Sequence, residues 1–271
     1  MALSLRLCQA RAMSRAGKAF PLARWYVISL RPLDRHAAVR RAAAKFGART
    51  FALSTLRLEA LPAGTALRQA LACPRIVATS PAAVRFAHAQ KPLRPRQDQH
   101  WFALGAGTAA ALRRLGIGNV HHPMRGNDSE SVLDLEGLAQ VAGEPVGLVT
   151  APGGRGLLAS QLRARGAQLQ VAEVYRRVPL AMAAARLREL LALPTSTAVL
   201  VSSGEALAAL WQALDVVGQL ALSARPAIAS SERLAAHMRA LGFTTVLVAR
   251  DTQPASMLAT LVDHVGDSGF R

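Results

Sequence analysis

Aromatic residues, cysteines and long apolar runs are scarce in this chain of 271 residues, and each scarcity excludes a class of protein. Aromatic residues make up 4% of the sequence, which leaves few platforms for stacking nucleic-acid bases. Cys8 and Cys73 lack the spacing of metal ligands or redox pairs, so we expect free thiols in a reducing compartment. No apolar run reaches the roughly 18 residues of a transmembrane helix. We therefore expect a cytoplasmic protein without membrane or nucleic-acid partners.

Acidic residues are also few, since 16 Asp and Glu stand against 33 Lys and Arg, for a formal net charge of +17. A basic surface favours anionic partners, which include nucleic acids and polycarboxylate ligands, although an arginine-rich genome gives the same composition. No zinc-finger, RNA-recognition or P-loop pattern accompanies the charge. A small anionic ligand is therefore the expected partner, and a nucleic-acid-binding regulator remains as an alternative that the low aromatic content weighs against.

Residues 1–24 contain basic residues and no acidic ones. This composition resembles a transit peptide, but the apolar stretches are too short for a secretory signal. We predict a disordered N-terminal arm over residues 1–24, with an upstream start codon as the other reading of this segment.

From Trp25 onward, short apolar runs alternate with amphipathic segments. Residues 25–30 predict a buried strand, and residues 34–46 predict a helix that ends at Gly47. The same order recurs along the chain, and apolar strands that alternate with helices indicate parallel sheets covered on both faces. Further strands, each followed by a helix, are predicted at residues 76–79, 101–104, 146–150, 198–201, 227–229 and 245–248.

A weak internal repeat divides the chain. Ser80 and Thr108 follow successive strands and lie 28 positions apart, as do Ser203 and Ser231. The repeat predicts two similar α/β lobes of flavodoxin-like type. Two extended segments, residues 52–59 and 171–178, fit neither lobe, and they predict an antiparallel two-stranded linker. The predicted domains are residues 25–52 with 179–265 and residues 58–173, and the linker strands are residues 53–57 and 174–178.

Hydroxyl side chains recur at the predicted helix starts, where each could accept a hydrogen bond from its own helix. In parallel α/β sheets, these helix starts lie beyond the carboxyl ends of the strands, where ligands bind. Their N–H groups and positive dipole ends suit carboxylates or phosphates. The pattern therefore predicts an anion-binding cleft, with its hydroxyls on Ser80, Thr108, Ser129, Ser203 and Ser231.

Two other motifs follow strands. The segment that begins Gly105-Ala-Gly-Thr departs from a dinucleotide-binding fingerprint, because Ala110 occupies the third glycine position. Gly153 and Gly154 permit close backbone approach, and Arg155 could pair with a carboxylate or simply follow a turn. The adjacent pair His121-His122 points to opposite sides of a strand, so we expect no metal site.

The ordered set of motifs resembles the uroporphyrinogen-III synthase family over residues 25–265. One departure is Ala82, because some members carry a basic residue there, so no essential cation is expected at this position. The segments that carry the resemblance are Ser-Leu-Arg-Pro at 29–32, Thr79-Ser80, Gly-Ala-Gly-Thr at 105–108, Asp-Ser-Glu-Ser at 128–131, Pro-Gly-Gly-Arg at 152–155, Val-Tyr-Arg-Arg at 174–177, Val-Ser-Ser-Gly at 201–204 and Ser-Glu-Arg-Leu at 231–234.

The resemblance implies two α/β lobes joined by a two-stranded linker, with the active site in the cleft between them. It implies a monomeric, cofactor-independent lyase that cyclises hydroxymethylbilane to uroporphyrinogen III with inversion of ring D, and transient contact with hydroxymethylbilane synthase. Tyr175 matches the family's linker tyrosine and is the predicted proton donor. The predicted substrate-binding residues are Arg31, Ser80, Thr108, Ser129, Gly153, Gly154, Arg155, Ser202, Ser203, Gly204 and Ser231. The alternative is a two-lobed protein that binds an anion or small molecule without catalysis.

Overall fold

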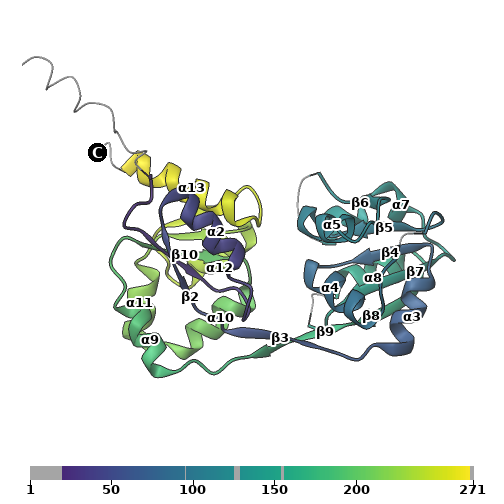
Figure 1. The fold of residues 1–271 in the computed structure, drawn as a ribbon, viewed down its shortest axis with the longest axis horizontal. Helices are drawn as coiled ribbons and strands as arrows, with labels where there is room; N and C mark the ends of the chain where they lie inside the picture. The colour runs from purple at the N-terminus through teal and green to yellow at the C-terminus, as the bar shows by residue number, and fades with distance from the viewer. Residues whose placement is uncertain (1–19, 95, 125–128, 154–155, 269–271) are drawn as a thin grey trace, which may run out of the picture. The chain divides into compact units, whose positions relative to one another are not determined.

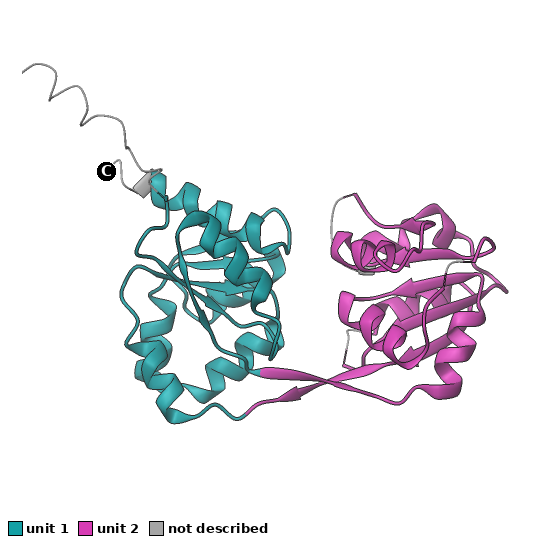
Figure 2. Cartoon of the chain, in the orientation of Figure 1, with its two compact units in different colours: residues 1–55, 181–271 teal, residues 56–180 magenta. Residues whose placement is uncertain are grey.

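The computed structural model describes residues 20–94, 96–124, 129–153 and 156–268 (Figure 1). The chain divides into unit 1, which comprises residues 1–55 and 181–271, and unit 2, which comprises residues 56–180 (Figure 2). Each unit contains a five-stranded sheet in which every strand pair is parallel. The predicted fold class, two parallel-sheet α/β lobes, is confirmed.

The sheet of unit 1 has the strand order β12-β11-β10-β1-β2. Its central strand, β10, is buried at all five positions, as a strand covered on both faces requires. The strands are β1 (Tyr26–Ser29), β2 (Arg49–Ala52), β10 (Thr197–Val201), β11 (Ala227–Ala229) and β12 (Val246–Val248).

Helices lie between most of these strands along the chain, and the last helix follows β12. Helix α2 ends at Gly47, whose φ of 82° is in the left-handed region that favours glycine. Leu22 is fully buried in the core of this unit, so packed structure begins before Trp25, within the segment predicted as a disordered arm. The helices are α2 (Ala37–Phe46), α9 (Ala184–Leu191), α10 (Gly204–Ala213), α11 (Val216–Ser223), α12 (Glu232–Ala240) and α13 (Pro254–Ser268).

The sheet of unit 2 has the strand order β6-β5-β4-β7-β8, with β4 at its centre. The strands are β4 (Arg75–Ala78), β5 (His100–Ala103), β6 (Val120–His121), β7 (Pro145–Thr150) and β8 (Gln168–Glu173). The helices are α3 (Gly64–Ala72), α4 (Pro81–Gln90), α5 (Ala106–Arg113), α6 (Ser129–Leu133), α7 (Glu136–Ala139) and α8 (Leu157–Ala164).

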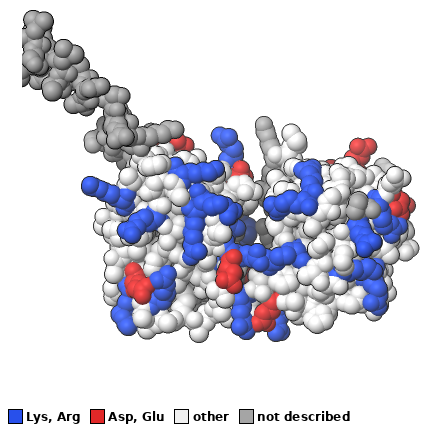
Figure 3. All heavy atoms as spheres, in the orientation of Figure 1, with Lys and Arg blue, Asp and Glu red and all other residues white. Residues whose placement is uncertain are grey.

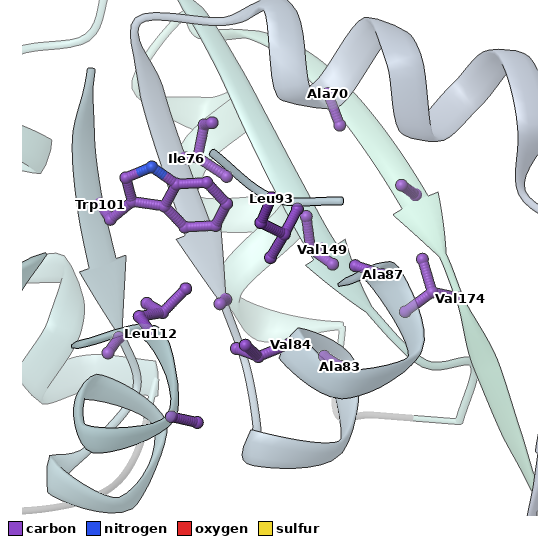
Figure 4. Packing of buried hydrophobic residues seen from close by; sticks show 14 of the residues in the cluster. Ala70, Ile76, Ala83, Val84, Ala87, Leu93, Trp101, Leu112, Val149 and Val174 are labelled. Atoms are coloured by element: carbon purple, nitrogen blue, oxygen red, sulfur yellow. The ribbon is translucent and has the colours of Figure 1, made fainter. Parts of the chain in front are cut away.

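One face of this sheet packs against α4 and α5 (Figure 4). Ile76, Trp101 and Val149 come from three neighbouring strands, and they meet Val84 of α4 and Leu112 of α5. Each of these side chains is 2% exposed or less, so the helix starts that follow the strands are fixed by a packed core.

A two-stranded antiparallel ribbon is formed by β3 (Leu56–Ala60) and β9 (Tyr175–Pro179), with Ala60 opposite Tyr175. The predicted linker strands, residues 53–57 and 174–178, lie one to three residues earlier. The extended segment 171–178 is in fact two strands, because its first three residues belong to β8 and pair with β7. The chain passes from sheet to ribbon at Val174, which is fully buried.

Candidate functional site

Each sheet has one place where the direction of strand addition reverses. In unit 1, β2 lies on one side of β1 and β10, β11 and β12 follow on the other. In unit 2, β5 and β6 lie on one side of β4 and β7 and β8 on the other. Open α/β sheets bind ligands beyond the carboxyl ends of the strands at such switch points. The candidate sites are therefore the edges beyond β1 and β10 and beyond β4 and β7.

At the edge of unit 2, Ser80 lies two residues after the end of β4 and is the N-cap of α4. Its Oγ accepts a hydrogen bond of 3.0 Å from Ala83 N, as predicted for a hydroxyl at a helix start. The preceding Thr79 donates through Oγ1 to Thr150 Oγ1 at 3.0 Å and so joins the ends of β4 and β7. Gly153, in the turn after β7, has a φ of 78°. These groups lie at the switch point of the sheet.

Tyr175 reaches this same edge from the ribbon. Its Oη lies 3.1 Å from Ser80 Oγ, although the two residues are 95 positions apart in the sequence. Its ring stacks on Phe86 of α4 with a centroid distance of 5.3 Å, and the residue is only 2% exposed. Arg177 donates from Nη2 to Tyr175 Oη at 3.5 Å. The structure thus brings the predicted proton donor and a predicted substrate-binding serine into one network.

At the edge of unit 1, two serines cap helices that follow neighbouring strands. Ser203 Oγ accepts from Ala206 N at 3.3 Å after β10, and Ser231 Oγ accepts from Leu234 N at 3.4 Å after β11. Ser202 and Gly204 flank the first cap, and Gly204 is the first residue of α10. Both predicted caps are confirmed, and both leave helix N-termini at the ligand-binding edge.

Arg31 follows β1 at the same edge. Its Nη2 donates to the carbonyl oxygen of Thr252 at 3.1 Å, and burial lowers the pKa of its guanidinium from the ordinary value. A cation that is partly withdrawn from water binds a carboxylate more strongly than an exposed one.

Comparisons with known proteins identify the family of this chain. The family model described as uroporphyrinogen-III synthase HemD matches residues 37–259. The chain belongs to the uroporphyrinogen-III synthase family. It is similar to the uroporphyrinogen-III synthase of Salmonella typhimurium, with 32% identity over 194 residues that cover 69% of this chain and 77% of that protein. The protein of that name from Escherichia coli is 31% identical over the same shares.

Solved structures agree at the level of the fold. A mutant uroporphyrinogen III synthase from Thermus thermophilus has a TM-score of 0.60 and 21% identity, over 90% of this chain and 99% of its own. The Helicobacter pylori uroporphyrinogen-III synthetase has a TM-score of 0.59 and 13% identity, over 89% and 99%. Membership of this synthase family makes the chain an enzyme of the cyclising lyase class, and favours this over a binding protein without catalysis.

One of the predicted helix caps is wrong. The N-cap of α5 is Gly105, and Thr108 lies inside the first turn, where it is 4% exposed. The helix begins at Ala106, two residues before Thr108, so Thr108 is buried within the first turn instead of capping the exposed N–H groups. Ser129 is the first residue of the short helix α6, and its side chain lies outside the described part. Gly154 and Arg155 also lie outside the described residues.

Sequence reasoning missed a histidine at the edge of unit 1. His36 is 6% exposed, and its two ring nitrogens lie 2.9 Å from Ser29 Oγ and 2.8 Å from Ser54 Oγ. Burial, followed by the guanidinium groups of Arg40 and Arg31, lowers the pKa of His36, while Asp34 opposes this effect. The imidazole joins the end of β1 to the segment that leads into β3. No local pattern of residues in the sequence predicts this bridge.

Two negative findings apply to the described residues. They contain no group of three or more His, Cys, Asp or Glu side chains placed to hold a metal ion. None of the helices among them is both long and apolar enough to cross a membrane.

Proposed function

We propose that this chain converts hydroxymethylbilane to uroporphyrinogen III. In this reaction the terminal hydroxymethyl group leaves as water, and the pyrrole nitrogen supplies the electrons that form an azafulvene cation. Ring D then attacks through its substituted carbon, and the spirocyclic intermediate fragments and closes again with ring D inverted. The protein must fold the linear chain, prevent direct closure and protonate the leaving hydroxyl.

The observation that carries the proposal is the meeting of Tyr175 and Ser80 at the switch point of unit 2, 3.1 Å apart, in a chain of this family. A phenol hydroxyl is a hydrogen-bond donor that can pass its proton to a leaving oxygen. General acid assistance is typically worth about 10²–10⁴-fold in rate. Tyr175 is the group that we propose to supply it.

We further propose that the substrate carboxylates bind mainly to backbone N–H groups at helix starts, with Arg31 as a cation. Ser80, Ser203 and Ser231 fix three of these helix starts through their caps. Lys and Arg side chains are widespread on the face drawn in Figure 3, where acidic side chains are few, so the protein attracts a polyanion over a longer range. The remaining proposed contacts are Thr108, Ser129, Gly153, Gly154, Arg155, Ser202 and Gly204.

The test is a coupled assay in which hydroxymethylbilane synthase supplies the substrate. The porphyrinogens are oxidised, and the type I and type III isomers are separated and quantified. We expect the type III isomer in proportion to added protein. A protein that binds the bilane without raising the type III isomer above the uncatalysed level would instead be the binding protein that the sequence left open.

Three properties complete the proposal: a cytoplasmic monomer, activity without a cofactor, and transient contact with hydroxymethylbilane synthase. Dialysis against a chelator should leave the rate of type III formation unchanged. Loss of that rate, with recovery on addition of a metal ion, would contradict the cofactor-independent mechanism.

A further inference from the structure

We propose that the proton of Tyr175 reaches the substrate through Ser80, and that Arg177 stabilises the negative charge left on the phenol oxygen. This inference rests on the proposed function, because it assigns the path of the proton that the dehydration consumes. Its starting point is a difference in exposure. Tyr175 is 2% exposed, whereas Ser80, its hydrogen-bond partner at the helix start, is partly exposed at the ligand-binding edge.

The donors and acceptors around these two hydroxyls limit how their protons can be arranged. Ala83 N can only donate, and it donates to Ser80 Oγ at 3.0 Å. The Arg177 guanidinium can only donate, and its Nη2 lies 3.5 Å from Tyr175 Oη. Between Oη and Oγ, at 3.1 Å, either hydroxyl could be the donor. Whichever oxygen accepts this bond keeps its own proton for another partner.

Burial decides between the two arrangements. If Ser80 donated to Tyr175, the phenolic proton would have to find another acceptor around a residue that is almost fully buried, and a buried hydroxyl without an acceptor is costly. If Tyr175 donates to Ser80, the serine proton points away from the pair, at a residue that solvent or substrate can reach. The second arrangement leaves each oxygen satisfied, and it aligns two protons in one direction.

The ring of Tyr175 is held in place, so the phenol does not readily turn outward to meet the substrate itself. It stacks on Phe86 with an interplanar angle of 11°, and the guanidinium carbon of Arg85 lies 4.6 Å from the centroid of Phe86. The guanidinium carbon of Arg177 lies 5.7 Å from the centroid of the Tyr175 ring. These contacts favour transfer through a neighbouring hydroxyl over rotation of the ring.

The step is balanced. The carbon–oxygen bond of the hydroxymethyl group breaks as the leaving oxygen takes the Ser80 proton and departs as water. Ser80 Oγ takes the proton of Tyr175, and the electron pair of that O–H bond stays on the phenol oxygen, beside the Arg177 guanidinium. The pyrrole nitrogen supplies the electrons that form the new carbon–carbon double bond. After ring closure, the pyrrole carbon of ring D that formed the new bond releases a proton as ring D becomes aromatic again, and this proton returns to the phenol oxygen.

The experiment is a double-mutant cycle on kcat for the type III isomer, with Ser80→Ala, Tyr175→Phe and both changes together. If the proton passes through both hydroxyls, either single change breaks the path, so we expect each to lower kcat about 100-fold or more. The double variant should then lose no more than the worse single variant. Multiplicative losses would show two independent roles and overturn the relay.

Helix capping needs a separate control, because Ser80 also stabilises α4. Ser80→Asn keeps a side chain that caps well but that cannot relay a hydroxyl proton, and Ser80→Thr keeps the hydroxyl. We expect Ser80→Asn to fold like the parent protein and lose kcat like Ser80→Ala, and Ser80→Thr to restore most of kcat. A Ser80→Asn enzyme with parental kcat would overturn the relay, since capping alone would then explain the serine.

Arg177→Met tests the charge on the phenol oxygen. We expect it to lower kcat about tenfold in the parent enzyme, as for a lost charge-assisted hydrogen bond, and to have no further effect on kcat in a Tyr175→Phe enzyme. The same loss in both backgrounds would remove Arg177 from the relay. Failure of the parent protein to form the type III isomer would refute the proposed function, whereas a large Tyr175→Phe loss with parental kcat in Ser80→Ala would refute the relay alone.

Discussion

The two units share one sheet topology and equip its ligand-binding edge differently. In both sheets the central strand, β4 or β10, is followed by a serine that caps the next helix. In unit 2 that serine contacts Tyr175 Oη at 3.1 Å. The other tyrosine, Tyr26, belongs to unit 1, but it is the first residue of β1, at the amino end of the strand, and its hydroxyl accepts from Arg49 at 2.8 Å. The same scaffold therefore places the proposed proton donor at one edge, and helix caps together with Arg31 at the other.

The next strand shows a second difference. After β11 in unit 1, Ser231 caps α12 with its side chain, whereas after β5 in unit 2 the cap is Gly105 and Thr108 faces inward. Thr108 and Ser231 each lie 28 positions after the serine that follows the central strand of their sheet. In spite of this equal spacing, only Ser231 caps a helix. Under the proposed function, unit 2 would supply the proton donor and unit 1 would supply binding contacts, and mutations can test this division.

The largest effect should come from the phenol of unit 2. Tyr175→Phe removes one oxygen from a packed ring, so folding should be preserved while kcat falls by about 10²–10⁴-fold, or roughly 3–5 kcal/mol in activation free energy. Tyr26→Phe is the matched control, because it removes the other phenolic oxygen of the chain and should leave kcat unchanged. The measurement is type III formation at saturating bilane. A Tyr175→Phe enzyme within about threefold of the parent would move the proton donor to another group.

Loss of Arg31, the proposed substrate-binding cation of unit 1, should affect substrate binding more than the chemical step. Arg31→Met removes one partly buried charge, and loss of a charged hydrogen bond typically costs about 1.5–3 kcal/mol, so KM should rise about tenfold or more with kcat nearly unchanged. Arg225→Met is the matched control. Arg225 is also buried, but it donates to the carbonyl oxygens of Leu191, Leu193 and Pro194, so its loss should lower the unfolding temperature and leave KM unchanged. A fall in kcat without a rise in KM for Arg31→Met would contradict the division.

The caps of unit 1 should have smaller effects. Ser203→Ala and Ser231→Ala each remove an N-cap, so each should lower the free energy of unfolding by about 1 kcal/mol. The backbone N–H groups remain at the helix starts, so activity should fall only a few-fold. These effects would be measured by urea unfolding and by KM for the bilane. A loss of kcat as large as that of Tyr175→Phe would place chemistry in unit 1 as well.

The alternation of strands and helices was sufficient to predict the fold class, because buried parallel strands are apolar runs and their helices are amphipathic. The boundary between β8 and β9 was not predictable, because residues 168–179 stay extended on both sides of Val174. Only pairing partners distant in the sequence separate the strand of the sheet from the strand of the ribbon.

The candidate site was predicted only as far as local patterns reach. Serines at predicted helix starts correctly predicted the N-caps Ser80, Ser203 and Ser231. The same pattern was wrong at Thr108, because Gly105, three residues earlier, is the N-cap of that helix. The contact between Ser80 and Tyr175, and the bridge from His36 to two serines, join residues that only the folded chain brings together.

The smallest expected effect is a pH dependence of stability that originates at His36. Its pKa is lowered in the folded protein, first by burial and then by Arg40 and Arg31, so the unfolded chain binds a proton more readily than the folded one. The stabilisation from the neutral imidazole is therefore complete above its unfolded pKa of about 6.5, and it is lost as the pH falls from there toward the lowered folded value.

We expect the unfolding free energy of the parent protein to exceed that of His36→Ala more at pH 7.5 than at pH 5.5. Urea unfolding of both proteins at both pH values measures this, and the comparison cancels the titration of carboxylates that the two proteins share. An equal difference at the two pH values would show that His36 stabilises unit 1 only through its hydrogen bonds to Ser29 and Ser54, which either charge state of the ring can make.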